Sequence, residues 1–187
     1  MEIILAENHG FCYGVKRAVE MANEAADSDG KSYTLGPIIH NPQVVGRLES
    51  KGVSPIQEVS DIDEGTMIIR SHGVGPAIYE EAEEKGLNIL DATCPHVKKA
   101  QQDAKSVIED GMTLVILGEK NHPEVKSINL WANNKGIIIE DEESAQKLQI
   151  VEKMGVVVQT TFSQFKFNSI IEILEKKSKN LKVFKTI

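Results

Sequence analysis

The sequence predicts an α/β protein in which short, mostly parallel strands alternate with amphipathic helices. Two observations carry this prediction. Runs rich in β-branched residues alternate with segments of helical periodicity, and the whole pattern occurs twice along the 187 residues. Alternation of this kind is typical of right-handed βαβ units on a parallel sheet. We therefore expect two small α/β units of similar plan, one over 1–93 and one over 94–187.

The predicted strands are short apolar runs bounded by polar or glycine-containing segments. They lie at Ile3–Ala6, Ser32–Leu35, Met67–Arg70, Asn88–Leu90, Thr113–Leu117, Gly136–Ile139, Gly155–Gln159 and Leu181–Phe184. Helices are predicted where apolar residues recur every three or four positions. They lie at Val15–Ala26, Gln43–Ser50, Pro76–Lys85, Val97–Asp110 and Gln164–Lys177.

The internal repeat has a constant spacing of 82 residues. Each copy contains a cysteine, a helix, a strand, a glycine and a histidine close to a proline. The matching positions are Cys12 with Cys94, Val15–Ala18 with Val97–Ala100, Gly36 with Gly118, and His40 with His122. In addition, the run 68–72 has a counterpart in 157–161, and both end in polar side chains. A register shared by so many features indicates duplication of one unit.

Charge and hydropathy exclude several classes of function. The formal net charge is −7, whereas a sequence-independent nucleic-acid binder is normally basic. No apolar run approaches the ~20 residues of a membrane helix, and residues 1–6 lack the basic start and the cleavage site of a signal peptide. We expect a cytoplasmic protein with no nucleic-acid or membrane partner. An anionic small substrate remains compatible, because a local pocket can be positive on an acidic protein.

Cys12 and Cys94 each follow a predicted strand and open a predicted helix. A helix N-terminus carries a partial positive charge that stabilises a thiolate, and thiolate is the form that binds iron or zinc. Because there is no secretory signal, a disulfide is not expected. Two equivalent cysteines at strand ends would face one shared centre. The alternative is that each is an inert buried thiol.

Three histidines lie at the ends of predicted strands or in the loops that follow. His40 and His122 are the repeated pair, and His72 ends a third strand. Imidazoles gathered at one crevice indicate an anion or metal site. Further ligand-capable groups near element ends are Glu124, Thr160 and Thr161. For the threonine pair, plain β-propensity is the alternative explanation.

Six segments resemble the signatures of the 4-hydroxy-3-methylbut-2-enyl diphosphate reductase family, also called the LytB type. Any one of them is weak, but they occur in the family's order across nearly the whole chain. They are Gly10–Val15, Gly36–Asn41, Arg70–Val74, Asp91–Pro95, Gly118–Glu124 and Gln159–Thr161.

The resemblance implies a pseudo-threefold trefoil of three α/β units around a 4Fe–4S cluster, with one cysteine ligand from each unit. An open iron acts there as a Lewis acid on the leaving oxygen. The reaction takes up two electrons and two protons from a ferredoxin- or flavodoxin-type donor and expels water from 4-hydroxy-3-methylbut-2-enyl diphosphate. It yields isopentenyl and dimethylallyl diphosphates in the non-mevalonate isoprenoid pathway.

The same resemblance implies roles for individual residues. Cys12 and Cys94 correspond to cluster ligands, and Glu124 corresponds to the acid of the proton path. Of the two threonines, Thr160 is favoured near the leaving group because it is nearer the strand, and Thr161 is expected to contact substrate. The residues expected to bind the diphosphate are His40, His72 and His122.

In one respect the sequence departs from the family pattern. The third cysteine and a Ser-Ser-Asn-type motif of the family would follow Ile187. We therefore expect the first two of three units, with the third unit absent. A chain of this extent is expected to hold no stable cluster and to be inactive alone, and its oligomeric state is not legible in the sequence.

Two other functions are compatible with the same residues. One is a structural zinc site formed by the cysteines and nearby histidines, although the paired Cys-x-x-Cys spacings that zinc usually uses do not occur. The other is an α/β module that binds a metal or a phosphate-bearing ligand without redox chemistry.

Overall fold

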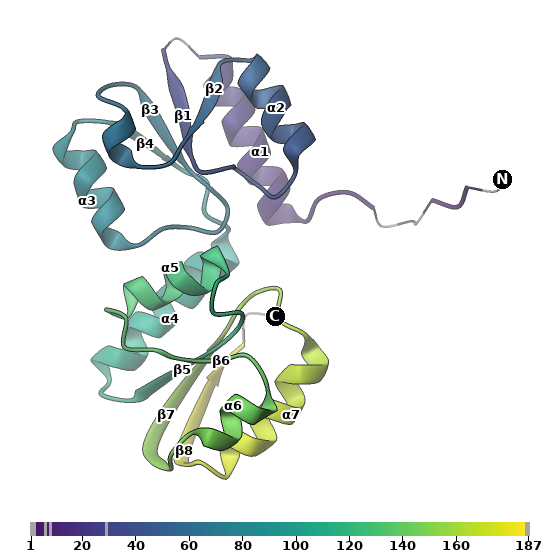
Figure 1. Cartoon of the computed structure of the whole chain (residues 1–187), viewed down its shortest axis with the longest axis vertical. Coiled ribbons are helices and arrows are strands. Elements are labelled where there is room, and N and C mark those ends of the chain that lie inside the picture. Colours follow the sequence, from purple (N-terminus) through teal and green to yellow (C-terminus); the bar gives the residue numbers. More distant parts are fainter. Residues whose placement is uncertain (1–2, 6, 8, 29, 186–187) are drawn as a thin grey trace.

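The structure is a computed structural model that describes residues 3–5, 7, 9–28 and 30–185. The described part of the chain forms two parallel four-stranded sheets that share no strand. Figure 1 shows them as two successive units, each with helices on both faces of its sheet. The predicted α/β class with parallel strands is therefore confirmed.

The first unit has the strand order β2-β1-β3-β4. Its elements are α1 (Tyr13–Ala26), β1 (Ser32–Leu35), α2 (Pro42–Ser50), β2 (Val53–Ile56), a 3₁₀ turn (Val59–Asp61), β3 (Thr66–Ile69), α3 (Pro76–Glu84) and β4 (Asn88–Asp91).

The second unit has the strand order β6-β5-β7-β8, which is the same order displaced by four strands. Its elements are α4 (Pro95–Glu109), β5 (Thr113–Leu117), α5 (Pro123–Trp131), β6 (Ile137–Ile139), α6 (Glu142–Lys147), β7 (Val151–Val158), α7 (Gln164–Glu175) and β8 (Ser178–Phe184). The repeat in the sequence is thus also a repeat of topology.

Each sheet is buried on both faces, because helices cover both sides of a parallel sheet. The central strand β3 contributes Met67, Ile68 and Ile69, all fully buried. Ile68 packs toward α1 and α2, while its two neighbours pack toward α3. The second sheet is arranged in the same way, with one core cluster on each face.

Local sequence explains where several helices begin. The Asn41 side chain accepts hydrogen bonds from the backbone N–H groups of Gln43 and Val44, which caps α2. Helices α4 and α5 each begin with a proline, at Pro95 and Pro123, where the missing N–H has no cost. These starts place the preceding residues, Cys94 and His122, at the helix N-termini.

The prediction of a strand at Ile3–Ala6 is wrong for residues 3–5, which form no strand and are exposed. Figure 1 shows this N-terminal segment leading away from the first unit, so no neighbouring strand satisfies its backbone groups. The position of Ala6 lies outside the described residues. The predicted strands Ser32–Leu35 and Thr113–Leu117 match β1 and β5 to the residue, and the boundaries of the remaining ones shift by one to four residues.

Four elements, namely β2, the 3₁₀ turn, α5 and α6, lie outside the residue ranges predicted from the sequence. β2 contains Pro55, and a proline argues against a strand, but β2 is an edge strand, where proline is tolerated. The helix α5 begins at a proline and follows the repeat's histidine, and the short α6 is capped by Asp141.

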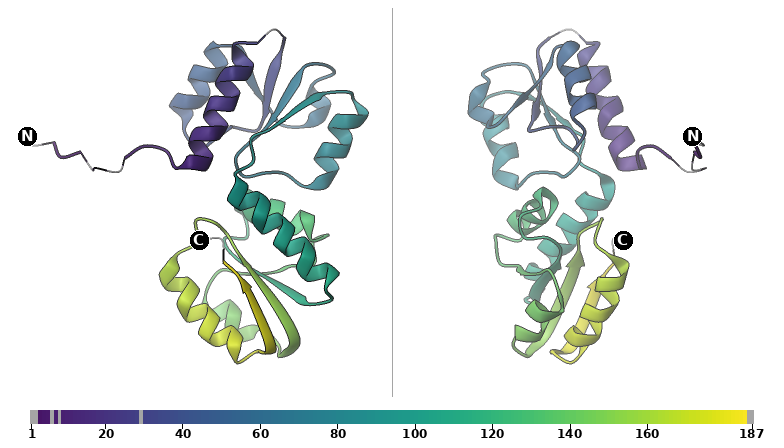
Figure 2. Two further views of the ribbon diagram at one scale, coloured as in Figure 1. Left: turned by 180° about the vertical axis from the view of Figure 1, so that it is seen from behind. Right: turned by 45° about the vertical axis from the view of Figure 1, so that its right-hand side comes forward.

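The two units are joined through α5 and the loop after β3. Ser127 donates from its hydroxyl to the carbonyl oxygen of His72 at 2.8 Å, and Trp131 Nε1 donates to the Val74 carbonyl at 2.9 Å. Figure 2 shows from two further sides that this junction is the narrow region between the units. These bonds tie the end of β3 to the second unit. None of the helices in the described part of the chain is long and apolar enough to cross a membrane.

Candidate functional site

The three predicted histidines come together at the junction of the two units. His40 lies in the loop after β1, His72 in the loop after β3, and His122 is the residue that caps α5. The ring centroid of His72 is 4.7 Å from that of His40 and 5.4 Å from that of His122, and the third pair is 6.4 Å apart. Their potential ligand nitrogens all lie within 4.8 Å of one another.

The electrostatics of this cluster favour neutral imidazoles. Burial, followed by the neighbouring His40 and Arg70, lowers the pKa of His72 to about 4. Burial also lowers the pKa of His122, although the charge of Glu119 acts in the opposite direction. His122 Nδ1 accepts a hydrogen bond from the Glu124 backbone N–H at 3.2 Å. In the neutral ring, the proton of His122 therefore lies on Nε2, which can donate to a ligand.

Glu124 is a buried carboxyl in the first turn of α5, only 2% exposed. Its two oxygens accept hydrogen bonds from Thr160, one from the backbone N–H at 2.6 Å and one from Oγ1 at 2.9 Å. Burial raises the pKa of Glu124, and the two Thr160 bonds oppose that shift. The first turn of α5 thus holds a proton-binding group two residues from a clustered imidazole.

The two adjacent threonines have different surroundings. Thr160 contacts Glu124, whereas Thr161 Oγ1 accepts a hydrogen bond from Gln159 Nε2 at 2.9 Å. Thr161 lines a separate cavity together with acidic residues that include Glu119. The geometry therefore couples Thr160, and not Thr161, to the buried carboxyl.

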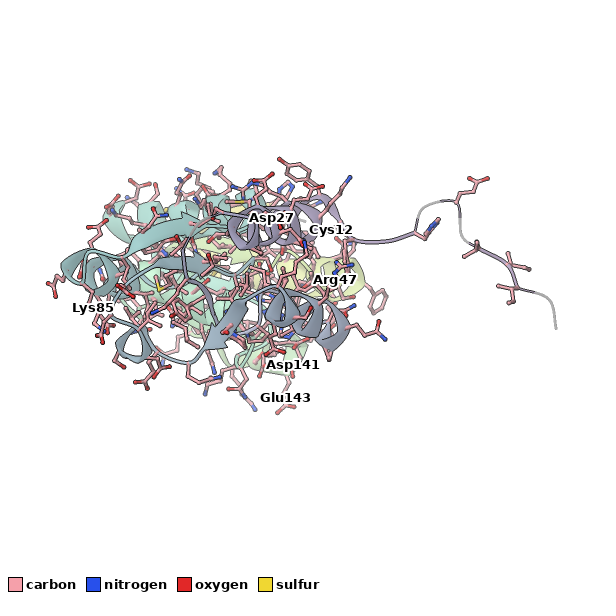
Figure 3. All side chains as sticks on the ribbon, turned by 90° about the horizontal axis from the view of Figure 1, so that it is seen from above. Cys12, Asp27, Arg47, Lys85, Asp141 and Glu143 are labelled. Atoms are coloured by element: carbon pink, nitrogen blue, oxygen red, sulfur yellow. The ribbon has the colours of Figure 1, made fainter. Side chains whose placement is uncertain are left out.

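Cys12 and Cys94 are the residues that immediately precede α1 and α4, and both are free thiols. Figure 3 places Cys12 at the end of α1 from which the extended N-terminal segment leaves. The sulfur of Cys94 lies against the first turn of α1, since a Cβ built on Gly14 would be 2.5 Å from it. Only a glycine permits this approach, so the two helix starts that carry the cysteines are in contact.

A cavity of about 250 Å³ connects the cysteine region with the histidines. It begins at Phe11 and Val15, on either side of Cys12, and reaches His40 and His72. Of the predicted site residues, His40 and His72 line this cavity.

The LytB protein family matches residues 3–187 of the chain. The chain belongs to the LytB family. It is 48% identical over 187 residues to a 4-hydroxy-3-methylbut-2-enyl diphosphate reductase of Geotalea uraniireducens (strain Rf4), covering 100% of this chain and 66% of that protein. A reductase of the same name from Geobacter metallireducens (strain ATCC 53774 / DSM 7210 / GS-15) is 46% identical over the same length, again covering 100% of this chain and 66% of that protein.

Solved structures of LytB-type reductases have the same fold. The structure of (E)-4-hydroxy-3-methyl-but-2-enyl diphosphate reductase superposes with a TM-score of 0.85 at 44% identity, over 99% of this chain and 67% of that one. The reductase from Plasmodium falciparum superposes with a TM-score of 0.90 at 30% identity, over 96% of this chain and 58% of that one. The LytB chain described here spans about two thirds of the length of its curated relatives.

The family resemblance that the sequence predicted is thereby confirmed. Sequence reasoning nevertheless missed Gly14, whose role appears only when Cys94 packs against it. It also missed Gln159, whose side chain is hydrogen-bonded to both Thr161 and the backbone N–H of Glu119. No local pattern signals either role, because each depends on a contact between segments far apart in the sequence.

Proposed function

We propose that this chain is part of a reductase that converts 4-hydroxy-3-methylbut-2-enyl diphosphate to isopentenyl and dimethylallyl diphosphates by reductive dehydroxylation in the non-mevalonate isoprenoid pathway. The observation that carries the proposal is the convergence of three imidazoles beside a buried Glu124–Thr160 pair. The names of the relatives support the reaction, and the geometry supports the assignment of residues to it.

The histidine cluster binds the diphosphate. Nε2 of His122 donates to a phosphate oxygen, and His40, the most exposed of the three, is accessible to an arriving anion. His72 has a buried Nδ1 without a hydrogen-bond partner. Charge-assisted hydrogen bonds to phosphate oxygens are stronger than neutral ones, so a bound diphosphate favours the protonated forms of His72 and His122, whose pKa values burial lowers.

Glu124 delivers a proton to the leaving oxygen. Burial raises the pKa of Glu124, which favours the protonated form that a proton donor needs, and Thr160 orients the carboxyl through two hydrogen bonds. Thr160 is the hydroxyl nearer the substrate's leaving group. Thr161 contacts substrate less directly, because its hydroxyl already accepts a bond from Gln159.

Cys12 and Cys94 fit a 4Fe–4S cluster as two of its thiolate ligands. The support is a close approach of Cys94 to α1 that only Gly14 allows, and soft sulfur donors suit iron–sulfur centres. When bound, the cluster supplies electrons and a Lewis acid to the substrate. The 187 residues contain two cysteines, so further ligation comes from outside them. The electron donor is a ferredoxin or a flavodoxin, and the enzyme acts in the cytoplasm.

Diphosphate binding by the 187-residue chain tests the proposal. In calorimetric titrations with the diphosphate substrate, His122→Asn should weaken binding about tenfold or more, since it removes a charged hydrogen bond. His96→Asn is the matched control, because His96 is exposed and outside the cluster. Equal affinities for both variants and the wild type would remove the histidines from substrate binding.

Cluster retention is a separate part of the proposal. Anaerobic reconstitution of the 187-residue chain, followed by iron and sulfide analysis, should yield no stable stoichiometric cluster and no turnover, because two thiolates leave the other irons open to water. Four irons per chain or per dimer, with measurable turnover, would contradict this expectation.

A second candidate function is metal binding without redox chemistry. The clustering of three histidine nitrogens within 4.8 Å favours it, since imidazole is a common ligand of zinc and related metals. Titration with Zn²⁺ should then show one site that is lost in His40→Asn. If inorganic pyrophosphate and Zn²⁺ compete for the cluster, the two candidates use the same residues, and the substrate titration above decides between them.

A further inference from the structure

A second cavity, of about 330 Å³, lies at the junction of the two units. It shares no lining residue with the cavity that reaches His40 and His72. Its walls come from the end of β1, from the loop after β3 with the start of α3, and from α5. Its volume is within the range of small-molecule pockets.

Arg70 lines this cavity and has no hydrogen-bond or ion-pair partner among the residues that the structure describes. Its Nε is buried without a hydrogen-bond acceptor, and burial lowers the pKa of the guanidinium. In the described part of the chain, no carboxylate pairs with Arg70, and no hydrogen bond satisfies it. A buried cation without a counter-charge is unfavourable. An anion that is not part of this chain would relieve that cost.

The rest of the lining is suited to an anion with an apolar body. Lys126 on α5 adds a second positive charge, and no aspartate or glutamate is among the described lining residues. This is notable for a chain of net charge −7, in which acidic residues outnumber basic ones. The apolar part of the wall consists of Leu35, Pro37, Val74, Ile78, Pro123 and Leu130.

At the equivalent position in the second unit, the polar side chain finds its hydrogen-bond partners within the same unit. Arg70 corresponds to Gln159 in the repeat, and each lies against the matching glycine, Gly36 or Gly118. Gln159 accepts a bond from the Glu119 backbone N–H and donates to Thr161. In the first unit, the position of Glu119 is taken by Pro37, which has no N–H.

We propose that the cavity around Arg70 and Lys126 is a second binding site, for a small phosphate ester with a short apolar body. The phosphate pairs with the two basic side chains, and the apolar body packs on Leu35, Ile78 and Leu130. The site goes beyond the proposed reductase function, because it uses none of the histidines, cysteines or carboxylates of that reaction.

Backbone NMR of the 187-residue chain tests this site with two probes, inorganic phosphate and 3-methylbutyl phosphate. Both should shift the amide signals of Gly36, Gly73 and Gly75 in a saturable way, since these residues line the cavity. The ester should bind about tenfold or more tightly than phosphate, because its methyl and methylene groups leave water. Shifts confined to His40, Asn41 and His122, or no saturable binding, would overturn the proposal.

Variants separate this site from the histidine cluster. Arg70→Met should abolish the shifts at the three glycines, while His122→Asn should leave them intact. A loss of diphosphate binding at the histidine cluster can thus be distinguished from a loss of ester binding at Arg70. Ester binding that survives Arg70→Met with unchanged affinity would overturn the proposal.

A stability measurement distinguishes ligand binding from a structural role for Arg70. Without ligand, Arg70→Met should keep or raise the melting temperature, because it replaces a half-buried, unpaired charge by an apolar side chain of similar length. If the variant instead fails to fold, Lys126→Met decides the question. Lys126 is exposed, so its replacement leaves the fold intact, and it should weaken ester binding about fivefold or more. Unchanged binding in Lys126→Met would then overturn the proposal.

Discussion

The two units have the same topology but present different chemistry at matching positions. The loop after β3 in the first unit contains His72, whose burial disfavours a positive charge, while the loop after β7 in the second presents Thr160 to a buried carboxyl. After duplication, identical backbones positioned equivalent side chains at one junction. In the function that we propose, the two units divide the work: the first contributes two of the three clustered histidines, and the second contributes the Glu124–Thr160 pair.

The two units also differ in whether the polar side chain after the central strand finds hydrogen-bond partners. In the second unit, Gln159 satisfies its polar groups within its own loop, whereas Arg70 in the first unit leaves a buried donor unpaired. An internally satisfied position stabilises the fold, and an unsatisfied one is more often retained for binding. We therefore place the proposed anion site around Arg70 on the first unit's side of the junction.

The largest effect is expected at the second unit's carboxyl. In the reductase that we propose, Glu124→Gln retains the shape and hydrogen bonds but removes the titratable proton. Turnover should fall about 10²–10⁴-fold, as is typical when a general acid is lost, while substrate affinity survives. Steady-state kinetics measure both quantities, with the exposed Glu143→Gln as control. Near-normal turnover would end the assignment of proton delivery to the second unit.

In the first unit, the burial of His72 should make the free energy of unfolding depend on pH. The pKa of His72 is about 4 in the folded chain, against about 6.5 when unfolded, so the unfolded state binds more protons between these values. The stabilising contribution, up to about 3 kcal/mol, is complete above pH ~6.5 and is lost as the pH falls toward 4.

Urea unfolding from pH 4 to 7.5 measures this slope, and His72→Asn should flatten it. The control is His96→Asn, at an exposed position of the second unit, which should unfold with the wild-type pH profile. Equal slopes for all three proteins would mean that the first unit does not hold a neutral buried imidazole.

A third contrast concerns the helix starts. Gly14→Ala would place a Cβ 2.5 Å from the Cys94 sulfur, so it should destabilise the chain by about 1–3 kcal/mol through overpacking. Gly46 is an exposed position of helix α2, and no atom lies near the new Cβ. Gly46→Ala should therefore stabilise the chain by about 0.5–1 kcal/mol. Thermal unfolding of both variants measures the sign. Stabilisation by Gly14→Ala would show that the cysteine helices are not in contact.

The smallest effect separates the neighbouring threonines. Thr160→Val removes one of the two bonds to Glu124, so it should raise the pKa of that carboxyl and cost about 1 kcal/mol of stability. Thr161→Val loses only the bond from Gln159 and should leave the titration of Glu124 unchanged. Carboxyl ¹³C NMR titrations of the two variants compare them. Identical Glu124 titrations in both would contradict the distinct orientations of the two hydroxyls.

Most strands and helices could be predicted because the spacing of apolar residues within each short segment already distinguishes a strand from a helix. The run Thr113–Leu117 is predicted to the residue, and the helices deviate only at their ends. The prediction failed where an element depends on neighbours. Residues 3–5 have strand-like side chains but no adjacent strand, and β2 tolerates Pro55 because it lies at a sheet edge.

The sequence by itself determined the class of the fold, the duplication and the family, because these follow from periodicity, a constant spacing and ordered motifs. It also named the histidines, the cysteines and Glu124 as candidates. Only the tertiary structure decided which atoms meet. It brought Thr160 rather than Thr161 to Glu124, seated the Cys94 sulfur against Gly14, and left Arg70 facing a cavity without a partner. These outcomes depend on contacts between segments far apart in the sequence, and such contacts leave no signal in any one segment of the chain.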